Sequence, residues 1–105
     1  MTDSPEAASL TGLDKVVHEP ARLMVMAHLY VIEEADFTFL VNQTGLTGGN
    51  LSFHLGKLEE AGYVEVEKQF RDRIPCTLLR LTREGRIAFR EYRARLTTLF
   101  ETLPE

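Results

Sequence analysis

The sequence has little cysteine, no long apolar run and no cluster of metal ligands. Its 105 residues include a single cysteine, Cys76, so an internal disulfide cannot form. The three histidines, His18, His28 and His54, are scattered, and no Cys/His spacing typical of a zinc site occurs. We therefore expect neither a metal site nor another cofactor.

Membrane and export signals are also lacking. The longest dense apolar run, residues 23–32, is about half of the roughly 20 residues that a membrane helix needs. The N-terminal stretch MTDSPE is acidic and lacks the basic start of a signal peptide. These absences predict a cytoplasmic protein that is not bound to a membrane.

Motifs of the common enzyme classes do not occur either. The sequence has no glycine-rich phosphate loop and no zinc-hydrolase spacing. It also lacks a serine, histidine and aspartate set with the flanking residues that nucleophilic catalysis needs. Catalysis is therefore the weakest functional hypothesis, and we expect a protein that is not an enzyme.

What is present is the composition of an ordinary globular domain. The residues are 44% hydrophobic and 27% charged, with no Gly/Ser-rich linker and no internal repeat. We expect a single domain over residues 1–105, with residues 1–9 forming a flexible tail. A chain of this length can bury only a modest core.

The net charge of −4 argues against a nucleic-acid partner until its distribution is considered. Residues 1–36 carry seven acidic and two basic side chains, whereas residues 37–83 carry five acidic and six basic ones. The one compact basic cluster consists of Lys68, Arg71 and Arg73. Acidity is thus concentrated in the N-terminal third, which leaves the remainder free to approach an anionic partner.

The N-terminal half reads as helices. Leu10, Leu13 and Val17 form a short amphipathic segment, and Pro20 suits the first turn of a nearly all-apolar core helix that runs to about residue 32. After an acidic turn at residues 33–36, Thr38 is the predicted cap of a short helix. Gly45 then ends that helix.

The next helix, at about residues 47–61, is the most informative. Thr47 can cap its first turn, and Gly62 can adopt the left-handed conformation that closes it. One face carries Leu51, Leu55 and Leu58, and the opposite face carries Gly49, Phe53, Gly56, Lys57 and Glu60. Two short helices joined in this way are typical of a helix-turn-helix, whose second helix reads the major groove of DNA.

Beyond Gly62 the apolar period changes from that of a helix to that of a strand. Residues 64–70 alternate, residues 71–75 carry turn chemistry, and residues 77–81 favour a strand again. This predicts a β-hairpin with a basic tip, a wing, at about residues 70–75. Thr82 then caps a final helix over residues 84–105.

The order of these elements, and several motifs along it, resemble a known family. The matching motifs are DFTFL at 36–40, GNLSFHL at 49–55, KLEEAGYV at 57–64, RIP at 73–75 and LTREGR at 81–86. Over roughly residues 14–95 the chain resembles small prokaryotic winged-helix transcriptional regulators allied to the MarR and ArsR families. The resemblance implies a mainly α fold with a β-hairpin wing, and a homodimer that binds double-stranded DNA through recognition helices in the major groove and wings on the backbone or minor groove.

By position, the resemblance implies DNA contacts from Thr47, Asn50, Ser52 and His54 on the recognition helix, and from Arg71 and Arg73 on the wing. From chemistry alone, Lys57 can neutralise a phosphate, Asn50 can pair with adenine, and Lys68 adds charge to the wing. The predicted DNA-binding set is Thr47, Gly49, Asn50, Ser52, Phe53, His54, Lys57, Lys68, Arg71 and Arg73.

Three positions of this set, and Gly56 beside them, allow a second interpretation. Phe53 can meet a thymine methyl group, or it can pack beneath a neighbouring loop or a partner chain. Gly49 and Gly56 each lower helix propensity by roughly 1 kcal/mol, which either close approach to a phosphate or close helix packing would offset. His54 can bond a phosphate or be a satisfied boundary residue.

Apolar stripes at both ends of the chain predict a two-fold interface. A single stripe would normally pack on its own domain, but a domain this small has little core to cover two. The spacing in the C-terminal helix is that of a coiled-coil seam. The predicted dimer residues are Leu10, Leu13, Val17, Phe89, Tyr92, Leu96, Leu99, Phe100 and Leu103.

The leading hypothesis is a DNA-binding transcriptional regulator that acts as a homodimer. The alternative is a winged-helix module for protein interaction, which the acidic balance and Phe53 favour. Related regulators respond to effectors, so a small-molecule effector is a further hypothesis. Redox sensing through Cys76 is another, although a buried small apolar side chain is the commoner fate of such a cysteine.

Overall fold

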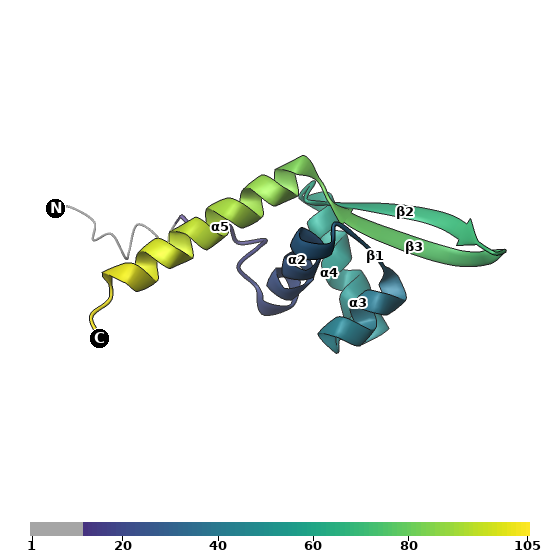
Figure 1. Ribbon diagram of the computed structural model, residues 1–105, viewed down its shortest axis with the longest axis horizontal. Helices are drawn as coiled ribbons and strands as arrows, with labels where there is room; N and C mark the ends of the chain where they lie inside the picture. Colours follow the sequence, from purple (N-terminus) through teal and green to yellow (C-terminus); the bar gives the residue numbers. More distant parts are fainter. Residues whose placement is uncertain (1–11) are drawn as a thin grey trace.

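The computed structural model describes residues 12–105, which form four helices and a small sheet (Figure 1). The elements are α2 (Pro20–Ile32), β1 (Glu34–Asp36), α3 (Phe37–Thr44), α4 (Gly48–Glu60), β2 (Val64–Arg71), β3 (Ile74–Leu81) and α5 (Arg83–Thr102). Helices α2, α3 and α4 form the body, from which the β2–β3 hairpin and the far end of α5 project in opposite directions. The predicted fold, mainly α with a β-hairpin wing, is confirmed.

Helix starts follow from local capping, with one difference from the expected residues. Thr47 accepts a hydrogen bond from the Asn50 N–H at 3.1 Å, and Thr82 caps α5 in the same way. The predicted cap of α3, Thr38, is wrong, because the Asp36 carboxylate accepts the Phe39 N–H at 2.7 Å and α3 begins at residue 37. A carboxylate at this position also interacts favourably with the positive end of the helix dipole.

The predicted acidic turn at residues 33–36 is replaced by a short strand. β1 pairs antiparallel with β3, so that the sheet has the order β1-β3-β2. The Arg80 guanidinium on β3 bonds the Glu34 carboxylate at 2.9 Å, and Ala35 is buried. The local pattern did not predict this strand because its partner lies more than forty residues away in the sequence.

The hairpin turn is shorter than predicted. Only Asp72 and Arg73 form it, with φ of 53° and 70°, as a two-residue turn requires. Pro75, expected in the turn, lies in β3 opposite Phe70. In a hairpin with a two-residue turn, the residues that flank the turn, here Arg71 and Ile74, form a hydrogen-bonded pair, and the next pair, Phe70 and Pro75, does not. The backbone nitrogen of Pro75 therefore faces away from β2, and its missing N–H costs no hydrogen bond between the two strands. β1 reaches only as far as Leu78, which leaves that edge open at Pro75.

The core lies where α2, α4 and the base of the sheet meet. Leu51, Leu55 and Leu58 of α4 are all buried, as their spacing predicted. The largest fully buried side chains are those of Val17, Val25, Met26, Leu29, Leu40, Leu51, Leu58 and Leu79. Among the described residues, no helix is long and apolar enough to cross a membrane.

Residues 12–19 reach this core through turns without forming a helix. Leu13 and Val17 are nonetheless buried in it. Asp14 organises the segment, because one carboxylate oxygen accepts the Val16 and Val17 N–H groups and the other accepts the Tyr63 hydroxyl. Leu10 and the predicted flexible tail, residues 1–9, lie outside the described residues.

Candidate nucleic-acid interface

α4 presents a continuous polar surface to solvent. Its leucine face is buried against the body, while Gly49, Asn50, Ser52, Phe53 and Lys57 on the other side are exposed. Thr47 is exposed at the start of the helix, where its hydroxyl is engaged as the cap. The surface expected to face DNA is therefore the one that the fold leaves open.

Phe53 is the unusual member of this surface. The described part of the chain leaves its side chain 58% exposed, so burial beneath a loop of the same chain does not explain it. The Lys57 ammonium lies 5.5 Å from the centre of the Phe53 ring, a cation–π contact that holds the two side chains together. An aromatic ring and a cation on one turn of helix offer apolar contact and charge at the same place.

Gly49 and Gly56 of this helix do not serve intramolecular packing. A Cβ atom added at Gly49 or Gly56 would have no atom within 4 Å. Close packing between helices of this chain therefore does not account for either residue. Both residues lower the helix propensity of α4, and this cost is consistent with the alternative interpretation, in which the backbone without a side chain approaches a phosphate closely.

His54 lies on the intramolecular side of α4. Its Nδ1 is 3.2 Å from an Arg22 guanidinium nitrogen and 3.8 Å from the Glu19 carboxylate, and only 15% of its side chain is exposed. Glu19 also caps α2 by accepting the Arg22 N–H. His54 thus links α4 to the start of α2 and lies apart from the exposed face of α4.

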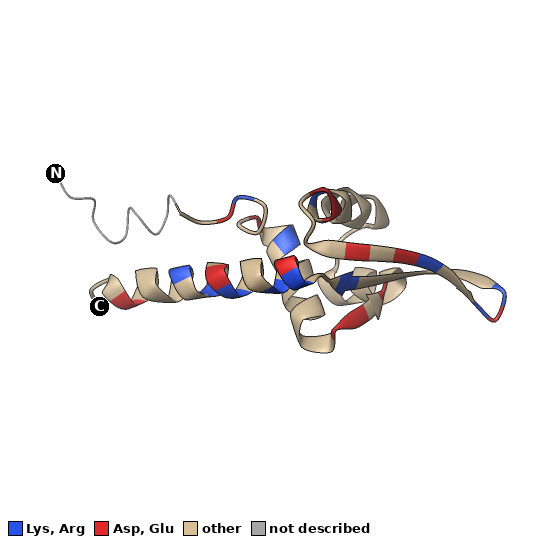
Figure 2. Ribbon diagram, turned by 90° about the horizontal axis from the view of Figure 1, so that it is seen from above, with Lys and Arg blue, Asp and Glu red and all other residues tan. Residues whose placement is uncertain are grey.

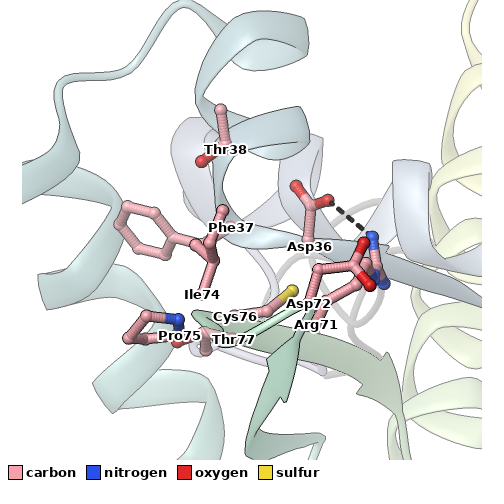
Figure 3. Close-up of a pocket in the computed structure, with 9 residues that line it drawn as sticks. All are labelled: Asp36, Phe37, Thr38, Arg71, Asp72, Ile74, Pro75, Cys76 and Thr77. Carbon is pink, nitrogen blue, oxygen red and sulfur yellow. Dashed lines mark ion pairs between the residues drawn. The ribbon is translucent and has the colours of Figure 1, made fainter.

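The wing carries the second group of predicted contacts. Lys68, Arg71 and Arg73 are all exposed, and Arg73 lies in the turn. Lys68 shares a groove with Ser52 and Gly56, so this face of the wing continues the α4 surface. Arg71 lies 3.9 Å from Asp36, beside a cavity of about 450 Å³ between the wing and the start of α3 (Figure 3).

Three carboxylates of the sheet pair with one residue at the base of the hairpin. The Arg80 guanidinium is 2.9 Å from Glu34, 3.5 Å from Glu65 and 2.7 Å from Glu67. Figure 2 shows acidic positions along the hairpin, and two basic positions on either side of one acidic position at its tip. The negative charge of the sheet is therefore partly balanced at the base, and the tip is left cationic.

Sequence reasoning missed two apolar side chains at the wing tip. Phe70 is 72% exposed and Ile74 is 66% exposed. Phe70 continues the alternation of Val64 and Val66, which reads as a core face, but the hairpin extends beyond the body and leaves it uncovered. The exposure of Phe70 could have been predicted only from the length of the hairpin relative to the body.

Apart from Leu10, which lies outside the described residues, the predicted dimer residues divide into two groups. Leu13, Val17 and Tyr92 are buried in the chain's own core, and Phe89 packs on Tyr30 with ring centres 5.1 Å apart. These four have little surface to offer to a partner. Farther along α5, Leu96 and Leu99 are half-buried, whereas Phe100 is 64% and Leu103 49% exposed. The stripe therefore becomes uncovered toward the C-terminus.

Cys76 is half-buried on β3 and lines the cavity beside Asp36 and Arg71 (Figure 3). Among the described residues, no group of three or more histidine, cysteine, aspartate or glutamate side chains is placed to hold a metal ion. The candidate site combines the exposed surface of α4 with the tip of the hairpin.

Comparison with known proteins agrees with this geometry. Residues 21–100 match the family described as "Winged helix DNA-binding domain". The uncharacterized protein MJ0432 of Methanocaldococcus jannaschii is 38% identical over 78 residues, which cover 74% of this chain and 85% of that protein.

Two solved structures are also similar. One is a transcriptional regulator homologue from Pyrococcus horikoshii OT3, with 26% identity, a TM-score of 0.88, and coverage of 97% of this chain and 100% of that one. The other is BpsR of Bordetella bronchiseptica, whose DNA binding is regulated by 6-hydroxynicotinic acid. It has 16% identity, a TM-score of 0.70, and coverage of 93% and 74%.

Proposed function

This chain belongs to the family of winged helix DNA-binding domains, and we propose that it regulates transcription by binding duplex DNA as a homodimer. The predicted resemblance to winged-helix transcriptional regulators is confirmed. The observation that carries the proposal is the exposed face of α4, which has polar, cationic and glycine positions but no internal packing role.

In the proposed complex, α4 lies in the major groove. Asn50 pairs with a base edge, Lys57 neutralises a phosphate, and Gly49 lets the backbone approach the duplex. Phe53, held beside Lys57, contacts the methyl group of a thymine. The wing supplies phosphate contacts from Lys68, Arg71 and Arg73.

The proposed dimer forms through the C-terminal half of α5. This helix runs well past the body, and Phe100 and Leu103 are exposed on the part that projects (Figure 1). Leu96 and Leu99 lie on the same stripe, with the three- and four-residue spacing of helices that pack in pairs. A two-fold pair of such helices would place two copies of α4 on one duplex.

The experiment is selection of bound sequences from random duplex DNA. We expect a two-fold repeat with half-sites about one helical turn, roughly 10 base pairs, apart. Four cations per protomer give about eight phosphate contacts in the dimer, so the logarithm of the affinity should fall with log salt at a slope of about −7. A slope near zero, or no enriched sequence, would contradict DNA binding and favour a protein partner.

Matched variants locate the contacts. Lys57→Ala should weaken binding to all sequences and reduce the salt slope by about 2, since a dimer loses two phosphate contacts. Asn50→Ala should relax the preference at one base pair of each half-site. Arg83→Ala, an exposed cation at the start of α5, is the control and should change neither quantity.

We extend the proposal to a small-molecule effector that alters DNA binding. BpsR, which shares the fold, is regulated in this way by 6-hydroxynicotinic acid. The test is to repeat the DNA titration with a panel of aromatic acids. A compound that lowers the affinity and also shifts the melting temperature of the free protein supports the extension, whereas a panel without effect on either contradicts it for this class.

A further inference from the structure

The tip of the wing combines charge with exposed apolar surface. Phe70 and Ile74 are 72% and 66% exposed, among the most exposed large apolar side chains of the described chain. They stand directly beside Arg71 and Arg73. A wing that only neutralised phosphates would need the cations alone, so the apolar pair calls for its own explanation.

The register of the hairpin places the two side chains on opposite faces. Phe70 pairs with Pro75, and Arg71 pairs with Ile74. Paired residues share a face and consecutive residues alternate, so Phe70 and Pro75 lie on one side of the ribbon and Arg71 and Ile74 on the other. The tip therefore carries an apolar side chain on each side, with Arg73 in the turn between them.

We propose that the wing tip is a wedge for the minor groove of DNA, which Phe70 and Ile74 enter while Arg71 and Arg73 hold the flanking phosphates. This inference rests on the proposed function and deepens it. The walls of the minor groove are formed by sugars, which accept apolar contact, and its rims are phosphates, which attract cations.

Entry must deform the duplex. The minor groove is about 6 Å wide, whereas two paired strands are already about 4.8 Å apart before their side chains are counted. A ribbon with an apolar side chain on each side fits only a widened groove, and widening bends DNA toward the major groove. The wedge therefore predicts a protein-induced bend at each end of the binding site.

Charge and continuity favour DNA over a protein partner. Lys68, Arg71 and Arg73 lie within six residues of sequence, against Asp72 alone in the same stretch. Lys68 and Phe70 share a face of the ribbon, and Lys68 borders the same groove as Ser52 of α4. The apolar tip thus continues the surface that we assign to DNA.

The test uses the full chain and a duplex that carries the selected site with a fluorophore at each end. Wild-type protein should shorten the distance between the ends, as measured by energy transfer. The double variant Phe70→Ala/Ile74→Ala should lose the bend and about tenfold in affinity, with an unchanged salt slope, because no phosphate contact is removed. Arg73→Ala should instead reduce the slope by about 2.

Val31→Ala is the matched control, because Val31 on α2 is 79% exposed and lies outside the wing. It should leave both bend and affinity unchanged. Melting curves of each variant verify folding, which removal of such exposed side chains should not disturb. We also expect sites selected by wild type, but not by the double variant, to carry flexible TA or CA steps at the wing positions.

The outcomes separate the two proposals. If wild-type protein selects no DNA, the proposed function fails and the wedge fails with it. If wild-type protein binds its site but the double variant binds and bends it equally well, only the wedge is overturned, and the apolar tip belongs to a protein contact instead. A bend that persists in the double variant also overturns it.

Discussion

Asp36 has two roles that a single substitution can separate. Its carboxylate caps α3 through the Phe39 N–H, and it lies 3.9 Å from the Arg71 guanidinium on the wing. The first role needs only a hydrogen-bond acceptor, whereas the second needs negative charge. In the free protein the carboxylate therefore competes with any phosphate for Arg71.

Asp36→Asn should strengthen DNA binding without loss of stability. Asparagine caps a helix about as well as aspartate, so the melting temperature should change little. Release of Arg71 from an exposed ion pair should raise the affinity for DNA about two- to fivefold at low salt. Titration of both proteins checks this, and Arg71→Ala should lower the affinity of each to the same value. An unchanged affinity in Asp36→Asn would contradict the competition.

Tyr63 gives the stability a dependence on alkaline pH. Its hydroxyl donates a hydrogen bond to Asp14, and this bond, together with burial, raises the pKa of Tyr63 to about 12. In the unfolded chain the tyrosine loses its proton near pH 10, while the folded protein keeps it. The stabilisation is therefore complete below pH 10 and is lost as the pH rises toward 12.

We expect Tyr63→Phe to be less stable than wild type by about 1 kcal/mol at pH 8, the usual net value of such a bond. The difference between the two proteins should narrow as the pH is raised above 10. Denaturant unfolding at pH 8 and pH 11 measures it. A difference that stays constant would show that the hydrogen bond to Asp14 does not set the titration of Tyr63.

Residues whose role is local were predictable, and those whose role depends on distant partners were not. Thr47 and Thr82 cap helices, and Gly45 and Gly62 have φ of 74° and 81°, as their sequence neighbours indicated. His54 differs, because Glu19 and Arg22, which it contacts, lie about thirty residues earlier. No helical pattern within α4 contains that information.

At the scale of elements, the start of α5 is fixed by contact with the turn after α4. Gly85 is buried, and a Cβ atom added there would lie 2.1 Å from the Tyr63 carbonyl oxygen. The Thr82 hydroxyl also donates to the Gly62 carbonyl at 2.6 Å. Because the obstacle is backbone, a larger residue at position 85 would have to shift one element against the other.

Gly85→Ala should therefore destabilise the protein by about 3 kcal/mol, at the upper end of what overpacking costs. Gly56→Ala is the matched control, since its Cβ meets open space in the middle of α4. It should stabilise the protein by up to about 1 kcal/mol through helix propensity. Urea unfolding of both variants decides this, and similar effects at the two positions would contradict the packing described.

The sequence predicted each helix from its own periodicity, but not the full sheet. α4 was predictable with both of its faces, because burial of Leu51, Leu55 and Leu58 follows from their spacing. β1 was not, because a three-residue strand has no period of its own and depends on Arg80 and Leu79 of β3. Similarly, the turn was predicted too long because Pro75 reads as a turn residue unless the hairpin register is known.

At the scale of the whole molecule, the described part of the chain, residues 12–105, is elongated. It extends 62 Å along its longest axis, with a radius of gyration of 16.0 Å, whereas a compact domain of this length has a radius of about 13 Å. The excess comes from the wing and from α5, which project in opposite directions (Figures 1 and 2). Both projections carry exposed apolar side chains, which is where partners are expected.

Phe100→Asp should convert the proposed dimer into a monomer, because it places a charge on the exposed end of the α5 stripe. This variant is a cleaner test than one at Leu96, which packs partly against its own core. DNA affinity should fall about 100-fold, as avidity is lost. Thr98→Asp, on the opposite side of the same helix, is the control. Light scattering measures the mass, and a Phe100→Asp dimer would contradict the proposed interface.

The length of α5 gives the molecule a lever arm. Its 20 residues span about 30 Å, so a tilt of about 5° at the C-terminal end would move the other end by about 3 Å. In the proposed dimer, a displacement of this size would change the distance between the two α4 helices, which must enter successive major grooves of one duplex. A ligand bound between the C-terminal helices of the proposed dimer would thus need to shift them only slightly to change the spacing of the two α4 helices.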